Sequence, residues 1–596
     1  MAVVPRSKYV YSAGVYTFGS DNSVTLLANV TSADVNAVVT FAWSCVALGS
    51  GSCPNLADQT LLNSQPNSKF LSIKAGVLSF AQDDQFNFTV VITNVATSVQ
   101  QSAYIVVQLL APPTLCSFEY SPSVIVPLET AVNLTLSGCS TNATDLQFRF
   151  VLVPQLNGSL TSPGQLPLDG FSLLPETTIP LLSTGNFTFI AVANVGSSFG
   201  ISSSVVLTAS ASVNGTVSTA DLQSVLNSAA YQDALSSGNS LVVSSISIAL
   251  LSSLNTLANS AGVNSTATTD LRTSIVSDIL AFATLQANDS SLPQATFSSL
   301  LSVLQVASNA PNEISNSTFG NIVDYITSYG GQTGDFGDAQ NAVQAIDGLL
   351  ISQLVDAPSS TGAFNPSTAN TTGYVLSLAD SESLLQALTD SLNAYVAASI
   401  VCGDVNNVLS GSSISANVGS PFSAGGLLLA ALLGGSITTG DSFDPPLSGG
   451  ADGCSTYHFV QSVLNPFSYA GDYSNTTVLS NVITLSFYDP SLPAGSPPIT
   501  IQGLDAGSAI TISLPIDPSS GVDATSPNVT CVFWNTTFSD WSDEGCTKDD
   551  DATTATTLVC SCSHLTDFAL GTLTIRFTPP VIPPTIDFAS KGLIVT

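Results

Sequence analysis

The order of hydrophobic and polar residues changes character along the chain. Strict alternation marks strands with one buried face, and it is clearest at residues 38–45, 86–92, 146–153 and 187–193. These stretches fall into two successive regions of about 100 residues each, which is the size of an immunoglobulin-like sandwich. We therefore predict all-β sandwiches over residues 1–110 and 111–214, with the proline-containing segment Ala111-Pro-Pro-Thr as a linker.

A helical period replaces the alternation over residues 215–400. Apolar side chains then recur at the spacing of one helix face, as at Leu271, Ile275, Ile279 and Phe282. The segments that start at Ser218 and Asp380 precede apolar runs and predict helix N-caps. Ordinary helix packing explains these apolar faces, so this part of the sequence predicts a helical subdomain.

Alternation returns after Cys402 and predicts a β-rich subdomain over residues 401–578. The strands expected most clearly are 480–488, 499–504 and 509–516. The proline-rich residues 579–596 predict an extended linker. The expected fold class is therefore multidomain α+β, with all-β sandwiches first, then a helical subdomain, then a β-sandwich subdomain.

Charge restricts the classes of partner. The 596 residues include 9 Lys and Arg against 41 Asp and Glu, which gives a net charge of −32. A surface of that sign repels phosphate, which argues against nucleic acid and anionic membrane surfaces as partners. Hydrophobic residues make up 44% of the chain, enough to build packed cores.

The sequence contains no recognisable signal or anchor. Met1 is followed by Ala-Val-Val-Pro-Arg without an apolar run, and the apolar residues 425–435 are too few to span a bilayer. We interpret 425–435 as a buried core segment. The chain is expected to be a fragment of an ectodomain whose signal and anchor lie outside the given sequence.

Glycosylation sequons and cysteines indicate the compartment. The ten cysteines are an even number, which favours disulfide bonds in an oxidising compartment over buried free thiols in a cytosolic protein. Sequons are spread along the whole chain and suit a secreted, glycosylated surface. They occur at Asn29, Asn87, Asn133, Asn142, Asn157, Asn186, Asn214, Asn264, Asn288, Asn316, Asn370, Asn475, Asn528 and Asn535.

Clustering of the cysteines predicts local disulfide bonds. Cys45 and Cys53 are close enough in sequence for a hairpin-like bridge, and Cys116 and Cys139 can pair within the second sandwich. Cys402 and Cys454 are also expected to be disulfide-bonded.

The most informative segment runs from Cys531 to Leu570. Cys560 and Cys562 are two residues apart, so in a strand both face the same way and each can reach a different upstream cysteine. We prefer the pairs Cys531–Cys560 and Cys546–Cys562, although spacing alone does not fix them. Zinc binding is the alternative, but C-x14-C-x13-C-x-C lacks the C-x2-C knuckles of structural zinc sites.

This segment resembles the GPS motif at the end of a GAIN domain, a motif found in adhesion-type receptors and polycystin/REJ-type proteins. The matching residues, within 531–572, are Cys531, Phe533, Trp534, Trp541, Gly545, Cys546, Cys560, Cys562, His564, Leu565, Thr566, Phe568 and Ala569. The helical and β-rich units are similar to the two GAIN subdomains, A and B. The two N-terminal β units look like REJ modules, on the segments 41–45 and 88–94.

The resemblance implies self-cleavage between Leu565 and Thr566. A threonine hydroxyl is a weak nucleophile until a base removes its proton, and His564 is the natural base. Thr566 would attack the carbonyl carbon of Leu565 in an N-to-O acyl shift, and water would hydrolyse the resulting ester. The alternative is that His564 is an ordinary polar residue near the end of a strand.

Other candidate chemistry is weaker. His458 is interpreted as a structural residue on a strand. The acidic run Asp549–Asp551 carries possible calcium ligands without EF-hand spacing, so a solvated loop is the better interpretation. With two histidines in the chain, we expect no metal site and no cofactor, and no motif supports turnover of an external substrate.

The resemblance implies the extracellular stalk of a polycystin-like or REJ-like membrane protein at the plasma membrane, with the cilium as a candidate location. Its implied roles are adhesion, mechanosensing or ciliary signalling. The expected partners are its own cleaved fragment, an extracellular protein or glycan ligand, and a transmembrane or channel portion beyond the given chain. An uncleaved structural or adhesive surface glycoprotein is the alternative.

Overall fold

The computed structural model describes residues 2–573 with internal gaps. The gaps are 6–8, 13, 20–22, 31–37, 50–51, 59–60, 63, 65–66, 75, 79–84, 142–145, 156–165, 168–172, 197–201, 259–264, 288–290, 311–312, 355–377, 401–403, 406, 422–423, 431–433, 446–453, 464–475, 490–495, 506, 517–521 and 536–539. The linker predicted at 579–596 lies outside the described residues.

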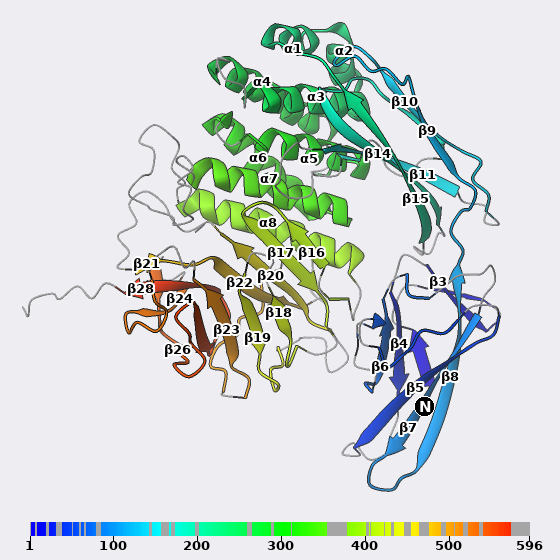
Figure 1. Cartoon of the computed structure of the whole chain (residues 1–596), viewed down its shortest axis with the longest axis vertical. Helices are drawn as coiled ribbons and strands as arrows, with labels where there is room; N and C mark the ends of the chain where they lie inside the picture. The colour runs from blue at the N-terminus through cyan, green and yellow to red at the C-terminus, as the bar shows by residue number, and fades with distance from the viewer. Residues whose placement is uncertain are drawn as a thin grey trace, which may run out of the picture.

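The N-terminal unit contains two sheets (Figure 1). One has the strand order β2 (Val10–Ser12), β3 (Val15–Gly19), β8 (Gln100–Leu110), β7 (Gln85–Asn94), β5 (Val39–Ala47), and the other is β1 (Ala2–Pro5), β4 (Val24–Asn29), β6 (Phe70–Ile73). Every second residue of β7 from Phe86 to Ile92 is buried, as the alternation predicts. Phe86 and Phe88 join side chains of β4 and β6 in one core.

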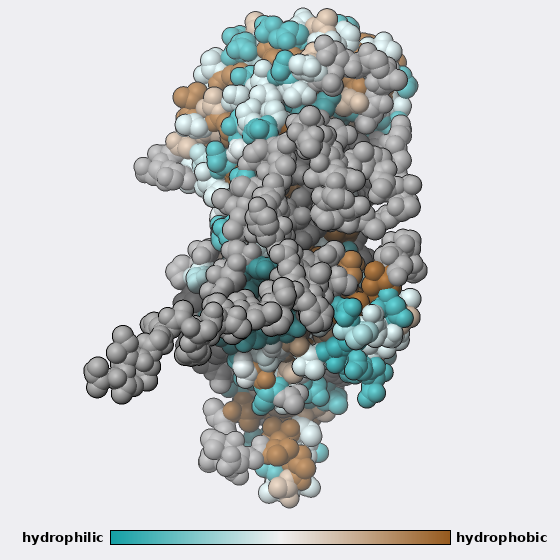
Figure 2. Space-filling view, turned by 90° about the vertical axis from the view of Figure 1, so that its left-hand side faces the viewer, coloured by the Kyte–Doolittle hydropathy of each residue, from teal (hydrophilic) through white to brown (hydrophobic). Residues whose placement is uncertain are grey.

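Some hydrophobic side chains of this unit remain outside the core. Val95 and Val99, between β7 and β8, and Tyr104 of β8 are exposed. Hydrophobic residues gather at the lower end of the molecule in Figure 2, where the β7–β8 hairpin lies in Figure 1. This end of the N-terminal unit is therefore apolar on its surface.

The second β unit packs onto the helices. Its sheets have the orders β13 (Glu176–Ile179), β10 (Val132–Ser137), β9 (Ser117–Ser121) and β12 (Leu166–Pro167), β11 (Leu146–Gln155), β14 (Gly185–Gly196), β15 (Ser202–Val213). Phe150 and Phe189 are fully buried in the same hydrophobic cluster as side chains of the following helices. This unit and the helical region therefore share one continuous core.

Eight α-helices follow within the described residues. They are α1 (Thr219–Leu226), α2 (Ala229–Ser237), α3 (Ser240–Ala258), α4 (Ser265–Gln286), α5 (Gln294–Ser308), α6 (Asn316–Tyr329), α7 (Phe336–Leu354) and α8 (Leu378–Ser399). In Figure 1 they stack from α1 at the top to α8 beside the last sandwich. Ser218 and Asp221 form a capping box on α1, as predicted. The cap predicted at Asp380 is wrong, because Asp380 lies in the first turn of α8, where the helix dipole favours a carboxylate.

One helix of the described chain, α3, is long and apolar enough to cross a membrane. It contacts α4 and α5 instead, and 61% of its most apolar stretch is buried inside the protein. Leu250 and Leu254 are fully buried in the shared core. The high hydropathy of α3 is therefore that of a core helix.

The C-terminal unit is a sandwich of two sheets. The first has the order β16 (Asn407–Ser410), β17 (Ile414–Gly419), β20 (Thr456–Ser462), β22 (Val482–Tyr488), β28 (Asp567–Leu573), β24 (Val529–Asn535), β25 (Asp540–Ser542), and β21 (Thr476–Val478) also pairs with β28. The second is β18 (Leu428–Ala430), β19 (Ser436–Thr439), β23 (Ile510–Pro515), β27 (Thr557–Cys562), β26 (Cys546–Lys548). The strand predicted at 499–504 is wrong, because its ends make single backbone contacts, Ile499 with Phe487 and Leu504 with Ser563, instead of a ladder.

One carboxylate fixes the helical layer to this sandwich. Asp347 of α7 is buried and accepts hydrogen bonds from three backbone N–H groups and two hydroxyls of residues 412–414, in the β16–β17 turn. Gln340 of the same helix exchanges two hydrogen bonds with the backbone of Ser410. A Cβ atom at Gly411 would lie 2.6 Å from the Asp347 carboxylate, so helix and turn pack without spare space.

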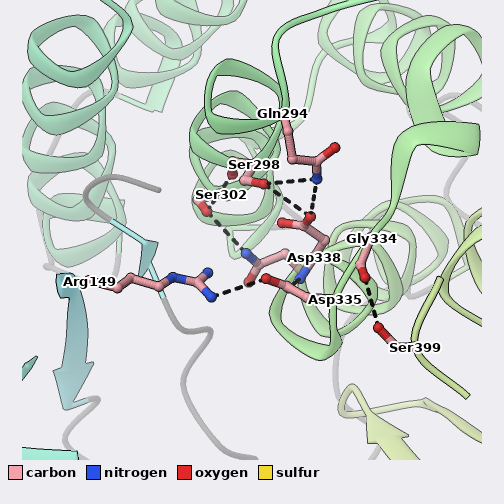
Figure 3. Close-up of polar contacts among 9 residues, drawn as sticks. Arg149, Gln294, Ser298, Ser302, Gly334, Asp335, Asp338 and Ser399 are labelled. Atoms are coloured by element: carbon pink, nitrogen blue, oxygen red, sulfur yellow. Dashed lines mark hydrogen bonds and ion pairs between the residues drawn. The ribbon is translucent and has the colours of Figure 1, made fainter. Parts of the chain in front are cut away.

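A second polar cluster joins the second β unit to the helices (Figure 3). Arg149 of β11 forms an ion pair of 3.1 Å with Asp335, just before α7. The Oδ2 atom of the buried Asp338 accepts hydrogen bonds from Ser298 at 3.0 Å and Gln294 at 2.9 Å, while its Oδ1 has no partner. Burial, followed by the charge of Asp335, raises the pKa of Asp338 to about 7. This junction therefore holds a carboxyl group that titrates near neutral pH.

Candidate functional site

Two disulfide bonds brace the end of the last sandwich. Cys531–Cys560 joins β24 of the first sheet to β27 of the second, so it ties the two layers together. Cys546–Cys562 joins the neighbouring strands β26 and β27, where the two residues are register partners. These are the pairs preferred from the sequence, and they leave none of these four sulfurs free to bind zinc.

The segment between β27 and β28 crosses from one sheet to the other. The N–H of Leu565 donates to the carbonyl of Ile501 at 3.2 Å. Asp567 opens β28, which pairs with β24 on one side and β22 on the other. The Leu565–Thr566 peptide bond therefore lies immediately before a strand in the middle of a sheet.

His564 is contacted on several sides. Its Nε2 atom lies 3.1 Å from the carbonyl oxygen of Glu544, and because a carbonyl only accepts hydrogen bonds, Nε2 of the neutral ring carries the proton and Nδ1 keeps its lone pair. The rings of Phe533 and His564 meet edge to face, with centroids 4.3 Å apart, and Phe568 stacks at 5.7 Å. Burial lowers the pKa of His564, opposed by the hydrogen bond and charge of Glu544. A neutral imidazole with one lone pair can act as a base.

The hydroxyl of Thr566 has a hydrogen-bond partner other than this base. Its hydroxyl donates to the carbonyl of Trp534 at 3.3 Å. Within the described residues, no hydrogen bond joins Thr566 to His564. A proton transfer from this hydroxyl to His564 would require its hydrogen bond to Trp534 to break.

The two tryptophans of the motif form a cross-strand pair. Trp534 and Trp541 are register partners on β24 and β25, and their rings meet at 5.6 Å and 71°. With Ala569 of β28 they belong to a small buried cluster, against which Leu385 of α8 packs. The tryptophans thus hold the strand after the candidate bond against the helical layer.

The sequence reasoning missed Asp567, the residue after Thr566. Its carboxylate accepts a hydrogen bond from the hydroxyl of Thr484 on β22. Burial raises the pKa of Asp567, and the Thr484 hydrogen bond opposes this. The only signal in the sequence was a charged residue at the start of an apolar strand.

His458 is a buried residue of β20. Its ring packs on Tyr488 at 4.4 Å, and its Nε2 has no hydrogen-bond partner. Burial lowers the pKa of His458 to about 3. It lies between sheet and helices as a neutral ring, in agreement with the structural interpretation.

The remaining predicted sites have varied outcomes. Cys45–Cys53 and Cys116–Cys139 are disulfides, Cys454 is also disulfide-bonded, and Cys402 lies outside the described residues. None of the described residues forms a group of acidic, histidine or cysteine side chains able to hold a metal.

The sequon asparagines that the structure describes are all at least partly accessible. They are Asn29, Asn87, Asn133, Asn186, Asn214, Asn316, Asn528 and Asn535. The others lie outside the described residues: Asn142, Asn157, Asn264, Asn288, Asn370 and Asn475.

Residues 452–570 match the family model described as GPS: GAIN subdomain B. The C-terminal sandwich is therefore a GAIN subdomain B, and the helices before it form a region like GAIN subdomain A. GAIN domains are typical of self-cleaving ectodomains of adhesion-type receptors and polycystins. The domain and the disulfide bonds together indicate the extracellular part of a membrane protein.

No curated protein matches the chain. Three N-terminal domains of the bacteriophage RB49 highly immunogenic outer capsid protein (Hoc) are 14% identical, with 36% of this chain and 70% of that chain covered and a TM-score of 0.17. Trypsin-activated alpha-2-macroglobulin from Escherichia coli is 10% identical, with 94% of this chain and 51% of that chain covered and a TM-score of 0.12. At such TM-scores neither likeness bears on fold or function.

Proposed function

We propose that the chain is the extracellular stalk of a polycystin-like or REJ-like membrane protein that cuts itself once, between Leu565 and Thr566. The observation that carries the proposal is the position of this bond. It follows an imidazole held in one tautomer and precedes β28, the strand between β22 and β24 in the matched GAIN subdomain B.

The residues supply a complete reaction. His564 Nδ1 takes the proton of Thr566 Oγ1, and Oγ1 bonds to the carbonyl carbon of Leu565. The C–N bond to Thr566 breaks as the nitrogen takes a proton from the imidazolium, which leaves an ester. Water then hydrolyses the ester to the Leu565 carboxylate and a free Thr566 with its amine and hydroxyl.

The cleaved fragments stay associated in this proposal. β28 pairs with β24 from Val529 to Phe533, and Phe568, Ala569 and Leu570 are fully buried. Backbone pairing and apolar burial of this strand hold the smaller fragment without a covalent bond. Force or ligand binding that withdraws β28 would expose Thr566 as a new N-terminus.

The other units follow from this assignment. We propose REJ-like modules over 1–110 and 111–214, the two GAIN subdomains over 215–400 and 401–578, and glycans on the accessible sequons. The REJ-like modules would bind an extracellular protein or glycan, and a transmembrane or channel portion would follow residue 596. The proposed roles are adhesion, mechanosensing or ciliary signalling, with ciliary placement part of the proposal.

The test is the chain length after secretion. We expect two bands on a denaturing gel, with the smaller fragment starting at Thr566 by N-terminal sequencing. Thr566→Ala and His564→Ala should each give one band, Thr566→Ser should still give two, and the exposed Thr547→Ala should match the unchanged protein.

A single band from the unchanged protein would instead favour an uncleaved adhesive glycoprotein. The observation in favour of this second candidate is the hydrogen bond from Thr566 to Trp534, which engages the hydroxyl with a partner other than His564.

A further inference from the structure

We propose that the turn 543–545 positions the imidazole of His564: the backbone carbonyl of Glu544 selects the ring nitrogen that carries the proton, and Gly545 leaves the space that the ring occupies. This inference rests on the proposed cleavage and names residues that act through His564 without touching the reacting bond.

Gly545 has no room for a side chain. Its φ is +82°, in the left-handed region that favours glycine. A Cβ atom built on Gly545 would lie 2.8 Å from His564 Cδ2, 3.1 Å from His564 Nε2 and 3.1 Å from Ser563 Oγ. The edge of the imidazole therefore packs directly on the glycine backbone, so that even a methyl group must displace the ring.

The turn and the histidine segment are matched residue by residue. The Glu544 carbonyl contacts the ring of His564 at 3.1 Å. The Gly545 carbonyl accepts two hydrogen bonds from Ser563, from N–H at 2.9 Å and from the hydroxyl at 3.1 Å. The third pair of this series is the disulfide Cys546–Cys562. Three successive residues of one segment thus hold three successive residues of the other.

This arrangement does the work that a carboxylate does for many catalytic histidines. A carbonyl that accepts from Nε2–H leaves Nδ1 unprotonated, and a ring in the wrong tautomer cannot take the proton of Thr566 at that atom. Phe533 limits the ring from a second direction. The charged group acting on the ring is the Glu544 carboxylate, which raises the pKa of His564.

The alternative, in which Gly545 serves only the backbone conformation of the turn, predicts a different effect of substitution. If Gly545 only satisfied the backbone angle, Gly545→Ala would lower stability and leave the cleavage rate of the folded protein unchanged. Gly76 of the N-terminal unit provides the matched control, because its φ is +75° and nothing lies within 4 Å of a Cβ built there. Gly76→Ala therefore introduces the same kind of backbone strain outside the sandwich that contains His564.

The first measurement is the rate of cleavage in the full chain from a secretory host, with intact mass to verify that the disulfides form. We expect Gly545→Ala to cut about 100-fold more slowly, the loss typical of a reacting group misplaced by about 1 Å, and Gly76→Ala to cut normally. Glu544→Gln keeps the carbonyl and removes the charge, so the acidic limb of its pH profile should move to lower pH. Normal cutting by folded Gly545→Ala overturns the proposal.

The second measurement does not depend on cutting. In a Thr566→Ala background, nitrogen NMR of labelled histidine reports which ring nitrogen is protonated, and a His564→Gln variant identifies the signal among the two histidines. We expect the Nε2–H form with Gly545 and its loss with Gly545→Ala. The Nδ1–H form with Gly545 overturns the positioning role, whereas a protein that shows Nε2–H but never cuts refutes only the proposed function. If Gly545→Ala is not secreted, Ser563→Ala replaces it in both measurements, with a smaller expected change.

Discussion

The buried carboxyl of Asp338 makes the stability of the β–helix junction depend on pH. Its pKa in the folded protein, about 7, lies above the ordinary 3.8, so the folded chain binds the proton more tightly than the unfolded chain. The stabilisation is complete below the unfolded pKa and is lost as pH rises through about 7. The junction in Figure 3 is therefore expected to loosen as the pH rises from about 4 to about 7.

Asp338→Asn removes the titration and keeps a neutral group of similar shape. At about 1.36 kcal/mol per pKa unit, the rise from 3.8 to about 7 sets a ceiling of about 4 kcal/mol on the energy lost by pH 8. We expect the variant to be more stable than the unchanged protein at pH 8 by about 2 kcal/mol, because water that enters the junction solvates part of the charge. At about pH 4, near the ordinary pKa of the carboxyl, the two proteins should be nearly equal.

The assay is urea unfolding from about pH 4 to 8, read together with hydrogen exchange in the first turns of α7. Asp233→Asn on the exposed surface of α2 is the matched control and should follow the unchanged protein. Parallel pH profiles for the unchanged protein and Asp338→Asn would refute the assignment, because the difference between them isolates this one group.

Three further perturbations test the packing. Asp347→Ala leaves the donors of the β16–β17 turn without their acceptor and should cost about 3 kcal/mol or more, seen as faster hydrogen exchange in α7 and β17; unchanged exchange would contradict the role of this carboxylate. Arg272 forms a buried ion pair of 3.0 Å with Glu313, so Arg272→Met should lower the unfolding free energy in urea by about 3–5 kcal/mol. Adding Glu313→Gln to this variant should recover part of the loss. No recovery would show that the unpaired Glu313 charge is not the cause of the loss. Replacing Cys531 and Cys560 by Ala should lower the unfolding free energy by about 2–4 kcal/mol, more than removal of Cys45–Cys53, since their separations are 29 and 8 residues; the reverse order would argue against a chain-entropy origin.

Local features of this fold could be predicted because they depend on nearby residues. The alternation of β7 and the capping box at Ser218 each lie within one element. Cys560 and Cys562 are also informative locally, since strand geometry sends both toward one face. The strand predicted at 499–504 was wrong for a related reason. Its residues do alternate, but a strand also needs a neighbouring strand to pair with, and local sequence does not encode that partner.

The contacts that organise the units could not be predicted. Asp347 and its partners are 65 to 67 residues apart in sequence, and Arg149 meets Asp335 across 186 residues. A polar residue on a helix reads as solvent-exposed unless its tertiary partner is known. The carbonyl of Glu544 was equally hidden, because backbone groups leave no mark on the residue types.

The shared core of the second β unit and the helices limits how the chain can be shortened. Phe150 and Phe189 lie in one hydrophobic cluster with Leu250 and Phe297. Dividing the chain near residue 215 would therefore expose apolar surface on both fragments. Recombinant fragments that begin near residue 215 are expected to aggregate. Fragments that begin near residue 111 retain all the residues of this hydrophobic cluster. A recombinant fragment that keeps the helices and the C-terminal sandwich should therefore begin ahead of the second β unit.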